Sequence, residues 1–273
     1  MESPEIGRSI VAGGIATNYH DVGKGRPVVF IHGSGPGVTA WANWRLNLPV
    51  ISERARVIAP DVVGFGYTER PADGKYSMKR WTEHLIAFVD ALELEEFDLV
   101  GNSFGGAMAI ALAVALGTRV RRLVLMGSVG VQFEVTEGLD RAWGYEPSLK
   151  GMRSLLDLFA YDKSLISDEL AELRYKASIR PGFQEAFSAM FPAPRENGIA
   201  ELATPPEKIA QITSRTLIMH GREDRIIPMS NSLKLFELIK DAQLHLFGKC
   251  GHWTQIEHKD TFNELVGDFI TQD

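Results

Sequence analysis

The chain is nearly devoid of cysteine, with one such residue, Cys250, in a sequence of 273. A single thiol cannot form an internal disulfide, and no partner stands beside it at a metal-ligand spacing such as C-x-x-C. These absences exclude a disulfide scaffold, predict no metal site, and favour a reducing compartment such as the cytoplasm.

Long apolar runs are also absent. The longest, residues 107–116, is much shorter than the roughly 20 residues that cross a bilayer, and it predicts a buried helix instead. Residues 1–10 contain two acidic side chains and no apolar stretch, which argues against a secretory signal. We therefore expect a cytoplasmic protein that neither spans nor binds a membrane.

Positive charge is scarcer than negative charge. The formal net charge is −6 and the isoelectric point is about 5.7, so the overall field repels phosphate backbones and disfavours nucleic acid as a partner. Hydrophobic residues make up 45% and charged residues 23%, as in ordinary globular proteins. This length and composition predict one large core, with an insertion, rather than a disordered chain.

The pattern of apolar residues predicts a doubly wound α/β sheet. Short apolar runs, typical of strands covered on both faces, occur at 27–31, 56–59, 98–100, 122–126 and 216–219. Apolar residues at helical spacing occur between and after them, at 80–92, 104–116, 229–239 and 261–270. Such alternation is typical of parallel strands joined by helices.

This alternation is interrupted between about residues 131 and 206. The segment contains helical patterns at 149–159 and 168–177 but no convincing strand, and the next strand is delayed by about 90 residues, far more than a usual crossover. We interpret residues 132–206 as an inserted helical lid, and residues 1–131 and 207–273 as the core. An ordinary run of core helices is the alternative.

Gly101-Asn-Ser-Phe-Gly105 fits the G-x-S-x-G turn that presents a nucleophilic serine between a strand and a helix. The bare pattern arises by chance in roughly one chain of this length in ten. Here it follows the predicted strand 98–100 and opens the predicted helix 104–116, which is the context that the turn requires. We therefore predict Ser103 as the nucleophile.

A serine hydroxyl becomes a strong nucleophile only when an imidazole takes its proton and a carboxylate orients the imidazole. In α/β-hydrolases these partners follow the serine, on loops after later strands. Asp224 follows the predicted strand 216–219, and His252 lies after the apolar run 243–247, between a glycine and a tryptophan. The sequence thus predicts a Ser103–Asp224–His252 triad, with Glu223 as the alternative acid.

The chain contains seven histidines, and chain position distinguishes among them. His220 ends a predicted strand, where we expect it to brace the acid loop. Four others fall within predicted strands or helices: His20, His84, His245 and His258. Only His252 stands on a loop downstream of the acid, which makes it the predicted base.

A serine hydrolase also needs N–H donors for the oxyanion that forms during attack. In this fold they come from the residue after the nucleophile and from the loop after the third strand, which predicts the backbone N–H groups of Phe104 and Ser34. The glycines of His32-Gly-Ser-Gly-Pro-Gly37 would let that loop approach a substrate oxygen.

The same loop allows another interpretation, because Gly35-Pro-Gly-Val-Thr-Ala40 satisfies G-x-G-x-x-A and Asp61 lies about 20 residues further on. A dinucleotide-binding oxidoreductase is therefore an alternative. Pro36 weakens it, since proline removes a backbone donor where a pyrophosphate would need one.

Together these motifs resemble the meta-cleavage product hydrolases of bacterial aromatic degradation, over nearly the whole chain. The segments that carry the resemblance are 32–44 (HGSGPGVTAWANW), 60–67 (PDVVGFGY), 101–106 (GNSFGG), 178–183 (SIRPGF) and 248–253 (GKCGHW). The resemblance implies an α/β-hydrolase fold and hydrolysis of a carbon–carbon bond in 2-hydroxy-6-oxohexa-2,4-dienoates such as 2-hydroxymuconic semialdehyde or its 6-methyl analogue. It implies no cofactor, no metal and a homo-oligomer.

The resemblance also implies site residues. Arg180 would bind the substrate carboxylate, and Asn43, Asn102 and Trp253 would line the dienoate end. Arg180 as a surface charge and Asn43 as a helix-terminus residue are the alternatives. Five apolar residues would border the 6-substituent or belong to the plain core: Val129, Leu139, Trp143, Ile226 and Ile227.

Two other functions fit the same triad residues. A carboxylesterase or lactonase needs the same nucleophile and base, and a catalytically silent ligand receptor could retain the scaffold. Epoxide hydrolases and haloalkane dehalogenases of this fold use aspartate as the nucleophile, so Ser103 argues against both.

Overall fold

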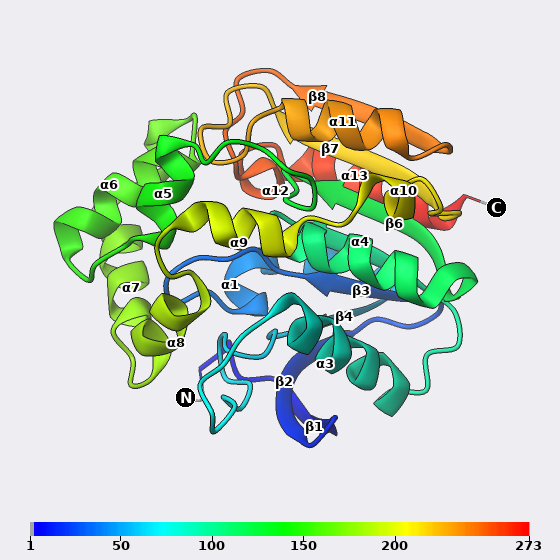
Figure 1. Ribbon diagram of the computed structural model, residues 1–273, viewed down its shortest axis with the longest axis horizontal. Helices are drawn as coiled ribbons and strands as arrows, with labels where there is room; N and C mark the ends of the chain where they lie inside the picture. Colours follow the sequence, from blue (N-terminus) through cyan, green and yellow to red (C-terminus); the bar gives the residue numbers. More distant parts are fainter. Residues whose placement is uncertain (1–2, 273) are drawn as a thin grey trace.

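The protein, as a computed structural model that describes residues 3–272, is built on an eight-stranded sheet with helices on both faces (Figure 1). The strand order is β1-β2-β4-β3-β5-β6-β7-β8, and β3 to β8 are parallel while β1 and β2 run antiparallel to their neighbours. The strands are β1 (Arg8–Ala12), β2 (Ile15–Val22), β3 (Pro27–Ile31), β4 (Arg56–Pro60), β5 (Phe97–Asn102), β6 (Val120–Met126), β7 (Arg215–Gly221) and β8 (Ala242–Phe247).

The chain crosses from β3 to β4 on one side and then returns to β5 on the other side of β3. Such a reversal opens a crevice at the carboxyl ends of the two strands, where ligands of open α/β sheets bind. The loop after β3 contains Ser34 and the turn after β5 contains Ser103, so two predicted site residues meet at this crevice.

Alternate residues along each parallel strand face opposite hydrophobic cores. In β3, Val29 and Ile31 pack into one core and Val28 and Phe30 into the other. The core that contains Val29 and Ile31 includes side chains of α3, α4 and α11, and the other includes those of α1, α2 and α13. Burial on both faces explains why these strands read as continuous apolar runs.

The helices and short 3₁₀ turns cover both faces and one end of the sheet. They are α1 (Ala40–Trp44), α2 (Leu48–Ile51), α3 (Met78–Ala91), α4 (Phe104–Leu116), η1 (Gly117–Arg119), α5 (Glu137–Trp143), α6 (Leu149–Phe159), η2 (Lys163–Leu165), α7 (Asp168–Ser178), α8 (Phe183–Met190), α9 (Arg195–Leu202), α10 (Pro206–Ile209), α11 (Ser230–Leu238), α12 (Thr254–Glu257) and α13 (Lys259–Thr271).

The segment between β6 and β7 is helical throughout its regular structure, as the sequence indicates. Helices α5 to α8 gather at one end of the sheet, on the left in Figure 1, while α9 runs back across α4. Local signals explain the helix starts: Ser148 caps α6 by accepting a hydrogen bond from the Gly151 N–H at 3.0 Å. That residues 132–206 act as a lid stays a prediction.

The predicted α/β-hydrolase fold is confirmed, but the amino-terminal hairpin of β1 and β2 was not among the strands singled out. β1 is largely exposed and β2 includes polar residues such as Asn18 and Asp21, so neither forms a continuous apolar run. An antiparallel pair at the edge of a sheet can face water and does not need such a run.

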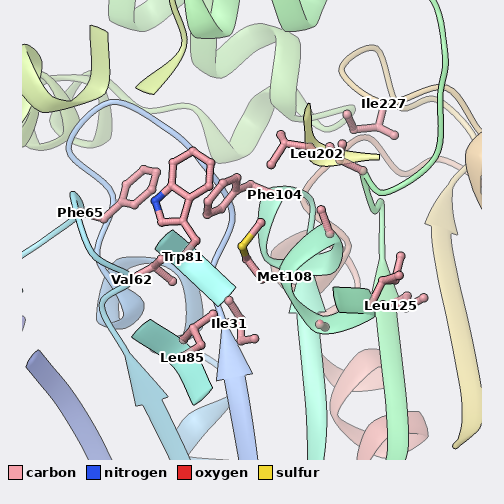
Figure 2. Close-up of a cluster of buried hydrophobic side chains, with 14 of the residues drawn as sticks. Ile31, Val62, Phe65, Trp81, Leu85, Phe104, Met108, Leu125, Leu202 and Ile227 are labelled. Atoms are coloured by element: carbon pink, nitrogen blue, oxygen red, sulfur yellow. The ribbon is translucent and has the colours of Figure 1, made fainter. Parts of the chain in front are cut away.

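An aromatic cluster anchors the start of α4. The indole of Trp81, from α3, lies near the rings of Phe65 and Phe104 (Figure 2), with 4.9 Å between the ring centroids of Trp81 and Phe104. The Phe104 side chain is fully buried, and its ring lies 5.4 Å from that of Phe65. The cluster thus fixes the first residue of α4, directly after Ser103, against the rest of the core.

We predict that buried His84 makes stability fall in acid. Its Nε2 lies 2.8 Å from the Thr17 hydroxyl, and burial lowers the pKa of His84 to about 4. The unfolded chain therefore binds more protons between pH 6.5 and pH 4, and stability present above pH 6.5 is lost as the pH falls through this window. Between pH 7.5 and pH 5.0 this one group accounts for about 2 kcal/mol.

The measurement is urea unfolding of the protein and of His84→Leu at both pH values. The Thr17 hydroxyl retains its bond to the Ile15 carbonyl in the variant, so only the titrating group is lost. We expect the variant to lose about 2 kcal/mol less stability on acidification than the parent. Equal losses in the two proteins would contradict the prediction.

Candidate active site

Ser103 occupies the sharp turn between β5 and α4, with a φ of 55° and a ψ of −115°. This backbone conformation costs a non-glycine residue about 1–3 kcal/mol and persists only where its surroundings hold it. The Ser103 N–H donates to the Met126 carbonyl at 2.9 Å, and the Ser103 carbonyl accepts from the Val129 N–H at 3.1 Å. The end of β6 and the loop after it therefore hold the strained turn in place.

Two glycines of the G-x-S-x-G motif are required by close packing. A Cβ on Gly101 would lie 2.5 Å from the Gly105 carbonyl oxygen, and a Cβ on Gly105 would lie 2.3 Å from the Ile31 carbonyl oxygen. Any side chain at either position would push α4 away from β3 and β5. The motif thus has a steric basis as well as a conformational one.

Asp224 and His252 lie together, as the sequence predicts. Imidazole Nδ1 is 2.7 Å from carboxylate Oδ2, and the two side chains are 3% and 1% exposed. An ionised carboxylate can only accept, so Nδ1 must donate, which leaves Nε2 with a free lone pair. This is the tautomer that a general base acting through Nε2 requires.

The protein holds Asp224 as a carboxylate. Its Oδ1 accepts backbone hydrogen bonds from Ile226 at 2.7 Å and Ile227 at 3.0 Å. Burial alone would raise the pKa of Asp224, but the electrostatic interactions and hydrogen bonds that the carboxylate receives from His252 and His220 outweigh burial and hold the pKa well below its usual range. The group is therefore ionised at neutral pH.

His220 braces this acid loop. Its Nε2 is 3.0 Å from the Ile227 carbonyl and 3.2 Å from Asp224 Oδ2, and its Nδ1 is 2.7 Å from the Ser232 hydroxyl. Two oxygen acceptors beside Nε2 place the hydrogen there, so Nδ1 accepts from Ser232. The rival acid Glu223 points elsewhere, accepting from Arg222 and from the Cys250 N–H at 3.0 Å.

Ser103 and His252 flank the same short segment after β6. The Ser103 carbonyl bonds the Val129 N–H, and a Cβ on Gly127 would lie 3.3 Å from the His252 ring. Across residues 3–272, neither the Ser103 hydroxyl nor His252 Nε2 has a hydrogen-bond partner. Both reacting groups are thus free, and their pairing during catalysis stays a prediction.

The two predicted oxyanion donors are also free. The N–H groups of Ser34 and Phe104 form no hydrogen bond within the described chain. The sequence analysis overlooked His32, which supports the first of them: its Nδ1 is 2.8 Å from the Gly33 carbonyl, and its Nε2 accepts from the Val62 N–H at 3.0 Å. Burial lowers the pKa of His32 to about 4, so this neutral bridge persists at neutral pH.

Trp143, the last residue of α5, links this helix to the loop after β3. Its indole N–H donates to the Ser34 hydroxyl at 3.0 Å, and its ring stacks on Phe191 with 4.5 Å between centroids. Because an indole N–H can only donate, the Ser34 oxygen accepts here and its own hydrogen remains available to another acceptor.

The end of α6 and the residues directly after it are also bonded to the loop that contains His252. The His252 N–H donates to the Phe159 carbonyl at 2.7 Å, and the Phe159 ring stacks on Trp253 at 5.4 Å. The Glu257 carboxylate accepts from the Gly251 N–H at 2.7 Å on one side and from the Tyr161 N–H at 2.7 Å on the other. The end of α6 and the loop that presents the imidazole are therefore joined through several backbone bonds.

A cavity of about 270 Å³ lies between these loops and the lid. Five predicted site residues line it: Ser34, Asn43, Asn102, His252 and Trp253. Ser103 is not a lining residue, but a Cβ on the lining residue Gly33 would be 3.4 Å from the Ser103 Cβ. Apolar side chains of α6 and α7 form the wall of the cavity on the side of these two helices.

The two asparagines leave polar atoms free at this cavity. Asn43 Oδ1 accepts from the Gly33 N–H at 3.2 Å and from Asn102 Nδ2 at 3.0 Å. Asn43 Nδ2 and Asn102 Oδ1 are buried without a partner among the described residues. A buried unpaired polar atom is costly, so both atoms fit contacts to a polar ligand.

Arg180 is paired with another residue of the chain and is not among the residues that line the cavity. Its guanidinium forms an ion pair with Glu5 and lies 5.5 Å from the centre of the Tyr67 ring. Two arginines that the sequence analysis did not single out line the cavity instead, Arg45 and Arg174. Arg174 follows the lining residue Leu170 by four positions and so shares its face of α7, but the sequence alone does not show that this face lines a cavity.

The five apolar residues proposed for the 6-substituent do not line this cavity. All are buried, with exposed fractions of 2% or less: Val129, Leu139, Trp143, Ile226 and Ile227. They belong to the larger of the two hydrophobic cores, which agrees with the alternative that these residues are ordinary core side chains.

Asp61, which the dinucleotide interpretation needs at a ribose, is occupied by the protein itself. It accepts from the Ala40 N–H at 2.6 Å, the Tyr67 N–H at 2.9 Å and Asn18 Nδ2 at 2.8 Å. This carboxyl fixes the start of α1 and the loop after β4, which leaves it unavailable to a nucleotide.

Residues 3–272 include no helix long and apolar enough to span a bilayer. They also include no group of three or more histidine, cysteine or acidic side chains that could hold a metal ion.

Comparison with known proteins gives a consistent result. Residues 26–259 match the α/β-hydrolase fold family. The chain is 61% identical to a 2-hydroxymuconate semialdehyde hydrolase of Pseudomonas sp. strain CF600, over 100% of this chain and 96% of the relative. It is also 61% identical to a 2-hydroxy-6-oxo-2,4-heptadienoate hydrolase of Pseudomonas putida strain F1, over 97% of this chain and 96% of the relative.

A solved structure extends the likeness to three dimensions. An alanine-for-serine variant of a meta-cleavage product hydrolase from Pseudomonas fluorescens IP01, complexed with acetates, is 59% identical and superimposes with a TM-score of 0.97, covering 98% of each chain. By its sheet, its relatives and its structural neighbours, the chain belongs to the α/β-hydrolase fold family and, within it, to the meta-cleavage product hydrolases.

Proposed function

We propose that the chain hydrolyses the C5–C6 bond of 2-hydroxymuconic semialdehyde or its 6-methyl analogue, with Ser103, Asp224 and His252 as its triad. The observation that carries the proposal is the wall of the cavity. His252 and the loop that contains Ser34 form one part of it, and another part is formed by Arg45 and Arg174, which have no ion-pair partner among residues 3–272. A substrate with a carboxylate at one end and a reactive ketone or aldehyde at the other fits such a wall.

Arg174 takes the role predicted for Arg180. It lines the cavity, and the only hydrogen bond of its side chain within residues 3–272 is a 3.2 Å contact from Nη2 to the Pro36 carbonyl. Its remaining donors can bind a carboxylate in the planar, two-point manner typical of arginine. Asn43 and Asn102 offer a donor and an acceptor at the same wall.

The reaction adds water across a carbon–carbon bond. The dienol first becomes the 2-keto tautomer by gaining a proton at C5, because only then can the 2-oxygen accept the electron pair of the C5–C6 bond. His252 is placed to move protons, and the N–H groups of Ser34 and Phe104 stabilise the oxyanion at C6. C6 leaves as formate or acetate, and the remaining carbons leave as 2-hydroxypenta-2,4-dienoate.

A small 6-substituent is favoured. The side chains proposed to border it are packed in the core, with Trp143 held between Ser34 and Phe191. The chain is also only 34% identical to a 2-hydroxy-6-oxo-6-phenylhexa-2,4-dienoate hydrolase of Burkholderia cepacia, against 61% for the semialdehyde and heptadienoate enzymes. Hydrogen or methyl at C6 therefore fits better than phenyl.

A cytoplasmic location and a homo-oligomer belong to this proposal. The buried free thiol of Cys250 is compatible with a reducing compartment. A second copy of the chain would cover β8, which ends the sheet, together with the exposed apolar side chains Phe236 and Leu246. Light scattering of the purified protein measures this association.

We predict that Ser103→Ala lowers kcat for 2-hydroxymuconic semialdehyde by about three to six orders of magnitude, because the triad acts as a unit. The yellow dienolate loses its colour on hydrolysis, so visible absorbance follows turnover directly. The variant should still bind the dienolate, and a fluorophosphonate should label the parent but not the variant. Near-normal turnover by the variant would remove Ser103 from the mechanism.

We also predict that Arg174→Gln and Arg180→Gln differ in effect. Loss of a charged hydrogen-bond donor at the carboxylate should lower kcat/KM for the dienoate by about 30- to 100-fold in Arg174→Gln. Arg180→Gln should change it by less than about threefold, since Arg180 pairs with Glu5 outside the cavity. Hydrolysis of the neutral ester p-nitrophenyl acetate should be nearly equal in both variants.

Steady-state kinetics with the two substrates measures these values. A larger loss for Arg180→Gln than for Arg174→Gln would restore the role that the sequence predicts. Fast turnover of p-nitrophenyl acetate with no consumption of the dienolate would instead identify a carboxylesterase.

A further inference from the structure

The Glu257 carboxylate joins two segments that are distant in the sequence. Its Oε1 accepts a hydrogen bond from the Gly251 N–H at 2.7 Å, and its Oε2 accepts from the N–H groups of Tyr161 at 2.7 Å and Asp162 at 2.9 Å. Glu257 is the last residue of α12, which begins two residues after His252, whereas residues 161 and 162 follow the end of α6. One side chain therefore bridges the loop that contains His252 and the end of α6.

The chemistry of this bridge requires a carboxylate. Three N–H donors converge on the group, and an ionised carboxylate accepts at both oxygens and carries no hydrogen of its own. A glutamine at position 257 would turn its NH2 group toward one set of donors and lose the bonds on that side. Bonds from N–H groups to a charged oxygen are also about twice as strong as those between neutral groups.

The bridge acts directly beside the base. Gly251 precedes His252, whose own N–H donates to the Phe159 carbonyl at 2.7 Å, and the Cys250 N–H donates to the Glu223 carboxylate at 3.0 Å. Three consecutive backbone N–H groups thus each have a fixed acceptor. A Cβ on Gly251 would lie 2.5 Å from the Phe159 carbonyl oxygen, so the loop and the end of α6 are in direct contact.

The position of this backbone decides where Nε2 of the imidazole points. The hydrogen bond from Nδ1 to Asp224 fixes one atom of the ring, and the backbone of residues 251 and 252 fixes the bond by which the ring is attached. Nε2 keeps one direction only while both are held. A shift of about 1 Å in a reacting group can lower a rate about 100-fold, so a bond that controls this backbone also controls turnover.

We propose that Glu257 is a positioning residue for His252. Its carboxylate keeps the imidazole in register with Asp224 by holding the loop of residue 252 on the end of α6. Among residues 3–272, Glu257 is not one of those that line the cavity, so it acts through His252 and not on the substrate. The inference rests on the proposed function, because it concerns the base of the same triad.

The test is Glu257→Gln, which keeps the size of the side chain but removes its charge and one acceptor oxygen. We expect kcat for 2-hydroxymuconic semialdehyde to fall about 10- to 30-fold and KM to change less than about twofold, because the base is displaced while the cavity wall is unchanged. The NMR signal described next shows whether the base has moved.

Two reactions separate this inference from the proposed function. Turnover of p-nitrophenyl acetate and labelling of Ser103 by a fluorophosphonate need the base but not the dienoate. Both rates should fall in Glu257→Gln by a factor similar to that for the dienoate. Failure of the unmodified protein to consume the dienolate would reject the proposed function alone.

Proton NMR reports on the base directly. The hydrogen between His252 Nδ1 and Asp224 should give a far-downfield signal in the unmodified protein, and Glu257→Gln should broaden or shift this signal. A side chain that only added stability would leave the signal unchanged in folded protein at the same temperature.

Glu201→Gln is the matched control. The Glu201 carboxylate also accepts from a backbone N–H, that of Met78 at 3.0 Å, but this bond joins α9 to the start of α3 and not to the loop of His252. The substitution removes the same charge and the same kind of bond. Its kcat should stay within about twofold of the parent, because distant sites without shared partners act independently.

A second pair of variants tests the bridge from the side of α6. Asp162 has a φ of −78°, which proline can adopt, so Asp162→Pro removes an N–H that donates to Glu257 without requiring a new backbone angle. Asp162→Ala loses the same side chain but keeps the N–H. We expect kcat to be about threefold lower in the proline variant than in the alanine variant, since one bond to the carboxylate is lost. This pair decides the question if urea unfolding shows that Glu257→Gln does not fold.

Three results with Glu257→Gln would overturn the proposal: a kcat equal to that of Glu201→Gln, a loss confined to KM, or a lower kcat with an unchanged downfield signal. Equal kcat in the two Asp162 variants would also reject it, because the bond to the end of α6 would then contribute nothing to turnover.

Discussion

The contact between Asp224 and His252 is the interaction on which the rest of the site depends. A buried carboxylate is stable only if it is hydrogen-bonded and paired, and here two backbone N–H groups, His220 and His252 supply those bonds. The resulting anion fixes the imidazole tautomer and leaves Nε2 free. The sheet contributes by bringing the loops after β5, β6, β7 and β8 to one end, so that groups distant in sequence can meet.

Charge is distributed unevenly in this molecule. The chain as a whole is acidic, yet among residues 3–272 those that line the cavity include Arg45 and Arg174 and no carboxylate. A low-dielectric cavity strengthens such local charges relative to the screened surface. The acidic composition therefore argues against a polyanionic partner such as nucleic acid, but it does not exclude a small anion as the ligand of this cavity.

The parts of the fold that could be predicted are those with local signals. Helix 104–116 is apolar along its length and follows the G-x-S-x-G turn, and its observed bounds agree with the prediction. Asp224 and His252 could be selected because chain order and loop position suffice to identify them. Arg174 and Arg45 could not be selected in this way, since whether a helical arginine faces solvent or a cavity depends on how α7 and α1 pack against other elements.

Arg180 shows that a residue selected by its motif can be paired with a residue that is distant in the sequence. It stands in a segment that resembles the family, but its partner, Glu5, lies 175 residues earlier in the chain. No local pattern indicates that an amino-terminal glutamate will occupy a guanidinium of the lid. His32 was overlooked for a similar reason, because its importance comes from bridging two loops rather than from any motif.

The bonds between Phe159 and the histidine loop have a consequence for the timing of substrate exchange. Withdrawing α6 from the sheet would break the hydrogen bond from the His252 N–H and unstack Trp253, and so would displace the imidazole from its carboxylate. A molecule in which these contacts opened would be temporarily inactive. One in which the cavity opened beside Leu46, a lining residue whose side chain is 37% exposed, would keep the contact between His252 and Asp224. If substrate and product pass beside Leu46, the enzyme can exchange them without breaking the hydrogen bond between His252 and Asp224 between turnovers.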